Sequence, residues 1–181
     1  TRQAIAGYRD AMTYVVQLAP DPPAIDASLL KSLHFMMLKH DLTKHPGQWR
    51  PGSIRVQDGD GDTVYEGPDR ELVEPLVAEL LEDLAQRRSP PIVRAAMAHL
   101  NLTLIHPFSD GNGRMARCLQ TFELATDGLA SPEFSSIEEY LGRNTPAYYE
   151  VLAQVARGGW SPDRSARHWL EFCLTAHLRQ A

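Results

Sequence analysis

Apolar residues recur at α-helical spacing along most of the chain. Near the start they fall three or four positions apart, which predicts an amphipathic helix from about Arg2 to Ala19. The three prolines at positions 20, 22 and 23 end that helix, because proline cannot donate a backbone hydrogen bond. The apolar positions that define this first helix are Ile5, Tyr8, Met12, Val15 and Val16.

Further segments continue the helical pattern. Asp26 is expected to cap a helix that runs to about His40, and Pro68-Asp69 opens another whose apolar stripe reaches Leu84. Ser89, followed by two prolines, begins a helix that ends near Ile105. The remaining helical segments are 113–125, 135–156 with a break near 144–146, and 162–178.

One region departs from helical spacing. Two short β-prone runs, 54–56 and 63–65, flank the turn Asp-Gly-Asp-Gly-Asp at 58–62, and this pattern predicts a β-hairpin. A lone hairpin is marginal in water, so it must lean on the helices. The acidic turn lacks the glutamate that a calcium loop requires, and we interpret it as a plain turn. The expected fold class is therefore all-α, with one small hairpin.

Composition restricts the class of protein. The 181 residues suit a single domain, residues 1–181, whether or not the chain is a piece of a longer protein. A net charge of −5 argues against a broad nucleic-acid-binding surface. No apolar run has the length of a membrane span, and the first residues do not resemble a secretory signal. Cys118 and Cys173 fit reduced, buried thiols, so the expected location is the cytoplasm.

Candidate chemistry is concentrated in residues 106–117, His-Pro-Phe-Ser-Asp-Gly-Asn-Gly-Arg-Met-Ala-Arg. The proline that follows His106 disfavours helical geometry there, which puts His106 at a helix exit. Gly111 and Gly113 allow the backbone angles of a tight loop, and Asn112 tolerates the left-handed region. Helical spacing of apolar residues resumes directly afterwards. The loop therefore leads into the N-terminus of a new helix.

This arrangement predicts an anion site, because backbone N–H groups and the positive end of the helix dipole face the loop. Arg114 and Arg117 project from one face of the new helix and suit a polyphosphate. Asp110 adds the single carboxylate that, with phosphate oxygens, commonly holds Mg²⁺. His106 supplies a group that titrates near neutral pH. Together these residues are typical of phosphoryl or nucleotidyl transfer.

The segment resembles the motif of the Fic family, H-P-F-x-(D/E)-G-N-G-R-x-x-R, at every defined position. The resemblance covers most of the chain. Residues 46–50 with the hairpin resemble the family's flap, residues 95–105 resemble the helix before the motif, and residues 136–152 resemble the later helices. Fic cores are small helical bundles with a β-hairpin flap over the active site, which agrees with the architecture expected from the periodicity.

The resemblance implies a protein adenylyltransferase, which transfers AMP from ATP to a hydroxyl of a target protein. His106 would be the general base that deprotonates the target Ser, Thr or Tyr. Asp110 would bind Mg²⁺ between the ATP phosphates, and Phe108 would be buried and anchor the loop. The remaining phosphate contacts would come from Gly111, Asn112, Gly113, Arg114 and Arg117.

The resemblance also places the substrates. Residues from Ile54 to Tyr65 would align the target protein by strand addition, and Tyr148 and Tyr149 would line the nucleotide base. Many Fic proteins are inhibited by a segment of pattern (S/T)-x-x-x-E-(G/N). Ser135 to Glu139 has the spacing but is followed by Tyr140, so the inhibitory segment is expected upstream or on a partner protein. The sequence leaves the oligomeric state open, a homodimer included.

Other functions remain open at this stage. Gly113 favours AMP transfer over phosphorylation, because the phosphorylating branch of the family often carries lysine there. The same site could instead remove AMP or transfer another nucleotide. A Fic fold could also bind nucleotide or a partner without turnover, although the intact motif argues against this. A third class, a phosphohydrolase with a transition metal on His99, His106 and Asp110, would need a further strong ligand.

Overall fold

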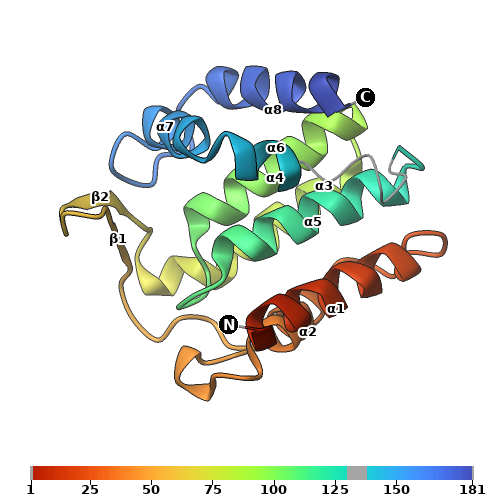
Figure 1. Ribbon diagram of the computed structural model, residues 1–181, viewed down its shortest axis with the longest axis horizontal. Coiled ribbons are helices and arrows are strands. Elements are labelled where there is room, and N and C mark those ends of the chain that lie inside the picture. Colours follow the sequence, from red (N-terminus) through yellow and green to blue (C-terminus); the bar gives the residue numbers. More distant parts are fainter. Residues whose placement is uncertain (1, 130–137, 181) are drawn as a thin grey trace.

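Residues 2–129 and 138–180, which the computed structural model describes, form α-helices joined by short loops and one β-hairpin (Figure 1). The fold class expected from the sequence is confirmed. The elements are α1 (Arg2–Leu18), α2 (Ala27–Leu38), the 3₁₀ turn η1 (Leu42–Lys44), β1 (Arg55–Gln57), β2 (Thr63–Glu66), the 3₁₀ turn η2 (Arg70–Leu72), α3 (Val73–Gln86), α4 (Pro91–Ile105), α5 (Asn112–Thr126), α6 (Glu138–Arg143), α7 (Thr145–Ala156) and α8 (Arg167–Gln180).

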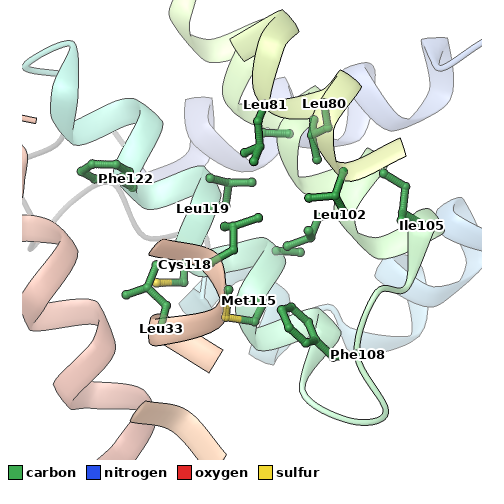
Figure 2. Packing of buried hydrophobic residues seen from close by; sticks show 14 of the residues in the cluster. Leu33, Leu80, Leu81, Leu102, Ile105, Phe108, Met115, Cys118, Leu119 and Phe122 are labelled. Carbon is green, nitrogen blue, oxygen red and sulfur yellow. The ribbon is translucent and has the colours of Figure 1, made fainter. Parts of the chain in front are cut away.

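Helices α4 and α5 form the centre of the fold and are joined by the loop that carries the motif. Helices α1 and α2 lie on one side of this pair, and α7 and α8 lie on the other (Figure 1). Two hydrophobic clusters result, one shared by α1 to α5 and one shared by α4, α6, α7, α8 and the hairpin. In the first cluster, side chains of α2, α3, α4 and α5 converge above Phe108 of the loop (Figure 2).

Helix α1 packs closely on α2 through a glycine. Its buried face carries Gly7, Ala11 and Val15, spaced four apart, whereas Ile5 is 72% exposed and lies off that face. A Cβ added at Gly7 would stand 2.6 Å from the carbonyl oxygen of Met36. The two helices therefore approach to a separation that only glycine permits at this position.

The hairpin forms where the sequence predicts it. Val56 pairs with Tyr65 in an antiparallel register, with an irregularity after Val56. The Tyr65 hydroxyl donates to the Leu104 carbonyl of α4 at 2.5 Å, and the Glu66 N–H donates to the Gly158 carbonyl at 3.0 Å. These bonds attach the hairpin to the helices.

The acidic turn is stabilised by the side chain of its first residue, Asp58. Asp58 Oδ1 accepts from the N–H groups of Asp60 and Asp62, each at 3.0 Å. This arrangement is typical of an Asx-type turn, in which a side-chain carboxylate accepts backbone N–H groups of the same loop.

Helix boundaries agree with the expected ones except at two starts: the helix expected from Pro68-Asp69 is preceded by the 3₁₀ turn η2 and begins at Val73, and the chain's last helix begins later than expected. Asp26 caps α2 by accepting from the Leu29 N–H at 2.8 Å, and the break near residue 144 separates α6 from α7. Helix α8 starts at Arg167 rather than at 162, because residues 161–166 form turns. Residues 135–137 of the predicted helix lie outside the described residues. Both cysteines are buried and unbridged.

No helix in the described part of the chain combines the length and apolarity needed to cross a membrane.

Candidate active site

His106 ends α4 in the left-handed conformation, with φ 51° and ψ 56°. This conformation turns the chain out of the helix, as the proline after it predicts. The Nδ1–H group of His106 donates to the Thr103 carbonyl at 3.2 Å, so Nε2 carries the lone pair and can accept a proton. Burial is the main cause that lowers the pKa of His106, with Arg50 adding to it and Asp110 opposing it. The imidazole is therefore held neutral, as a general base requires.

The loop after His106 is held in shape by side-chain hydrogen bonds within the loop. Asn112 accepts the Phe108 N–H at 3.0 Å and donates to the Phe108 carbonyl at 2.9 Å. Phe108 is fully buried and contacts Trp49, with ring centroids 5.0 Å apart. Phe108 thus anchors the loop, as expected. The Asn112 side chain serves the loop too, so an anion can meet only its backbone N–H.

The two motif glycines have different roles. Gly111 has φ +79°, the left-handed angle that glycine adopts without strain. Gly113 and Asn112 lie in α5 with helical angles, so the expectation of loop or left-handed angles at these two residues was wrong. The physical reason is that α5 starts at Asn112. A Cβ added at Gly113 would stand 3.4 Å from Nη1 of Arg117, so Gly113 keeps space beside an arginine.

His34 of α2 supports the loop from below, a role that the sequence did not assign to it. Its Nδ1 accepts the Gly47 N–H at 2.9 Å, which leaves Nε2–H to donate to the Asp110 carbonyl at 3.0 Å. The ring stacks on Phe108. Burial is the main cause that lowers the pKa of His34. A histidine on the buried face of a predicted amphipathic helix was the available signal.

The charged residues of the loop form a local group. Asp110 Oδ1 accepts the Gly111 N–H at 2.6 Å and lies 3.6 Å from Nη2 of Arg114. The Arg117 guanidinium lies over the Tyr8 ring of α1, 5.9 Å from its centroid. Both arginines occupy the first turns of α5, where the helix dipole disfavours cations unless an anion is present. This placement favours a bound polyphosphate.

Asp110 fits a magnesium ligand. Its side chain is 43% exposed, and both of its contacts fall on Oδ1. Oδ2 is therefore the oxygen that a metal could take without breaking either contact. One carboxylate beside a phosphate site is the donor set that Mg²⁺ commonly uses.

A cleft of about 740 Å³ joins the motif to the flap and to α7. His106, Gly113, Arg117, Tyr148 and Tyr149 line it, so five of the predicted site residues share one space. Hairpin residues 56–59, 64 and 65 line the same cleft. Phe108 and Asn112 are buried within the loop, and Asp110, Gly111 and Arg114 belong to the loop and the first turn of α5 without lining this cleft.

His99 lies beneath Tyr148 in a buried polar chain. Its Nδ1–H donates to Gln120 Oε1 at 2.6 Å, and its Nε2 accepts the Tyr148 hydroxyl at 3.1 Å. Gln120 Nε2 then donates to His177 at 3.1 Å. Burial lowers the pKa of His99 to about 3. Both ring nitrogens are used, and the described residues contain no group of three His, Cys, Asp or Glu suited to a metal, which argues against the transition-metal alternative.

The structure defines a class: helical domains in which a β-hairpin shares a cleft with a histidine, and a loop after that histidine leads into a helix N-terminus. The chain belongs to the Fic/DOC family, which it matches over residues 24–124. That range includes the flap, the loop and α5 up to Leu124.

Curated relatives are similar over most of this chain. It is 29% identical over 163 residues to protein adenylyltransferase Fic of Nematostella vectensis, covering 87% of this chain and 35% of that protein. It is 31% identical over 172 residues to protein adenylyltransferase Fic of Aedes aegypti, covering 88% of this chain and 32% of that protein. The chain thus spans about a third of the length of these relatives.

Solved structures share the fold. A Fic domain containing signaling protein from Bacteroides thetaiotaomicron superposes with a TM-score of 0.81 at 19% identity, over 98% of this chain and 69% of that one. IbpAFic2, solved in complex with adenylylated Cdc42, gives a TM-score of 0.65 at 16% identity, over 100% of this chain and 56% of that one. At these identities the likeness supports the arrangement of helices and flap.

Proposed function

We propose that this chain is the catalytic core of a protein adenylyltransferase that transfers AMP from ATP to a hydroxyl of a target protein. The observation that carries the proposal is the placement of His106. Its Nδ1–H is engaged with Thr103, its Nε2 lone pair is available, and the residue lines a cleft shared with Arg117 and the flap. The names of the curated relatives support the same activity.

The proposed chemistry balances within this site. His106 Nε2 takes the proton of the target hydroxyl, and the hydroxyl oxygen attacks the α-phosphorus of ATP. The bond between the α-phosphorus and the bridging oxygen breaks, and pyrophosphate leaves. Arg114 and Arg117 neutralise the leaving group, together with the backbone N–H groups at the start of α5. Asp110 would hold Mg²⁺, whose chemistry is to neutralise phosphate charge.

The hairpin supplies the site for the target protein in this proposal. A β-strand edge binds an extended segment through main-chain hydrogen bonds, whatever its side chains are. Such binding would lay the target's hydroxyl across the cleft toward His106. Tyr149 is 63% exposed at the other wall and is available to the nucleotide base, while the Tyr148 hydroxyl is engaged with His99. The inhibitory segment and the cytoplasmic location remain predictions.

The proposal is tested by incubating the chain and a host lysate with α-labelled ATP and Mg²⁺. Label is expected on protein with the wild type and is expected to be lost with His106→Ala. His168→Ala, at an exposed position of α8, serves as the matched control and should retain labelling. Chelation of Mg²⁺ should abolish the signal. Bound ATP without any labelled protein would contradict transfer and favour a binding module, and release of AMP from a labelled target would indicate removal.

A further inference from the structure

Arg50 is a buried cation with an unusual set of acceptors. It is 1% exposed, and its guanidinium donates to three main-chain carbonyls, those of His106, Gly52 and Pro68. Within the described residues, no carboxylate lies within ion-pair distance of it. A charge that is buried against carbonyl dipoles alone is tolerated only where its donors are well aligned.

The three acceptor carbonyls belong to three separate segments of the chain, and the bonds to Arg50 fix the relative positions of these segments. Gly52 precedes β1, Pro68 follows β2, and His106 carries the candidate base. Nε of Arg50 reaches the His106 carbonyl at 3.0 Å, and the Arg50 N–H donates to the Pro107 carbonyl at 2.8 Å. One side chain therefore binds both ends of the flap to the turn that holds the histidine.

Gly67 allows this close approach. A Cβ at Gly67 would stand 2.6 Å from Ile54 Cγ2, 3.6 Å from Nη2 of Arg50 and 3.9 Å from the His106 Cβ. The Gly67 N–H donates to the Ile54 carbonyl at 3.1 Å and closes the base of the hairpin. The end of the flap thus lies directly against Arg50 and the histidine.

The backbone conformation of His106 makes outside support useful. A left-handed conformation costs free energy in a residue other than glycine, so contacts that hold it contribute to keeping it in place. Its N–H is held by Leu102 and its ring by Thr103, both within α4. Arg50 is the contact that fixes its carbonyl from outside the helix.

We propose that Arg50 is a positioning residue that couples the seating of the flap to the orientation of the His106 imidazole. A target segment that pairs with the hairpin then steadies the general base through the same guanidinium. The coupling to catalysis rests on the proposed transfer activity, whereas the physical link between flap and histidine does not. Lysine cannot replace Arg50, because an ammonium does not offer three donors in one plane.

The test compares Arg50→Lys with Arg94→Lys, a matched buried arginine at the opposite end of α4. Arg94 is 4% exposed but is bound by the carboxylates of Glu123 and Asp127. Arg50→Lys should lower kcat for labelling of protein roughly ten- to a hundredfold per folded molecule, because small displacements of a catalytic group have such effects. The KM for ATP should change less than about twofold. Arg94→Lys should lower Tm and leave kcat per folded molecule unchanged.

A second readout is independent of activity. Hydrogen exchange at the Gly67 and Arg50 amides should accelerate together in Arg50→Lys and stay at wild-type rates in Arg94→Lys. If the wild type labels no protein, the proposed activity fails and exchange alone decides the coupling. Unchanged exchange rates in folded Arg50→Lys overturn the inference. A loss of total labelling activity that is fully explained by the unfolded fraction of Arg50→Lys overturns it too. Should Arg50→Lys not fold, Gly67→Ala displaces the same junction and must show the same kcat loss.

Discussion

The imidazole of His34 stacks on the ring of Phe108, with centroids 3.8 Å apart and planes 12° apart. The same imidazole accepts the Gly47 N–H and donates to the Asp110 carbonyl. Helix α2, the segment that leads to the flap, and the motif loop are therefore connected through one aromatic pair. A side chain outside the motif thus helps to fix the motif's shape.

Substitutions of His34 should distinguish the contributions of its two hydrogen bonds. His34→Ala is expected to lower the free energy of unfolding by about 2–4 kcal/mol, because a buried ring and two bonds are lost. His34→Gln can retain the donor to Asp110, and His34→Asn can retain the acceptor for Gly47. If the bond to Asp110 fixes the loop, His34→Gln keeps more labelling activity per folded molecule than His34→Asn. Equal activities would show that stacking on Phe108 alone matters.

The two motif glycines should respond differently to alanine. Gly111→Ala places a side chain at φ +79°, with its Cβ 3.1 Å from Leu38 Cδ1, and should lower the free energy of unfolding by about 1–3 kcal/mol. Gly113→Ala has helical angles and should keep stability within about 1 kcal/mol of wild type, while its methyl group crowds Arg117 and weakens ATP binding. Urea unfolding and nucleotide titration measure the two effects.

Gly142 offers the control for both glycine variants. It lies in α6 without a positive φ, and a Cβ there meets nothing within 4 Å. Gly142→Ala should leave ATP binding unchanged and should not lower stability. Loss of ATP affinity in all three variants would contradict the assignment of Gly113 to the phosphate site.

The rate of transfer should depend on pH through His106. Burial lowers the pKa of His106 from its ordinary value of 6.5, so the base form persists below that pH. The acid limb of kcat/KM is therefore expected below pH 6.5, with activity falling as pH drops through the lowered pKa. Initial rates between pH 5 and 8, with Mg²⁺ and ATP saturating, would locate the limb. A limb above pH 6.5 would show that His106 is not the neutral base described above.

Stability should fall in acid because of His99. Burial lowers the pKa of His99 from 6.5 to about 3. Between these two pH values the His99 imidazole is protonated in the unfolded chain and neutral in the folded protein. This contribution is complete above pH 6.5 and is lost as pH falls from 6.5 toward 3, at up to about 1.4 kcal/mol per pH unit. Burial lowers the pKa of His34, His106 and His177 as well, so their effects have the same sign.

Urea unfolding at pH 5, 6 and 7 measures this slope. His99→Gln removes the titrating ring. It should reduce the slope of the unfolding free energy against pH by up to about 1.4 kcal/mol per pH unit, the contribution of one proton. Equal slopes in the wild type and His99→Gln would contradict the assignment.

The sequence was sufficient for the parts that local rules control. Helical spacing, the Asp26 cap and the Gly/Asp turn predicted the elements, and residues 106–117 predicted the loop. Arg50 could not be found this way, since its partners are main-chain carbonyls, which any sequence supplies. The start of α8 was misplaced because Pro162 suits the first turn of a helix, whereas residues 161–166 form the connection from the bridge at Gly159 to α8.

Gly7 sits far from the motif in sequence, yet it controls how closely α1 approaches α2. The residue after it, Tyr8, places its ring under the Arg117 guanidinium. Any larger residue at position 7 would lift α1 and carry that ring away from the arginine. A random-mutagenesis screen for loss of nucleotide binding should therefore return hits at this glycine, on a helix that no motif search would include.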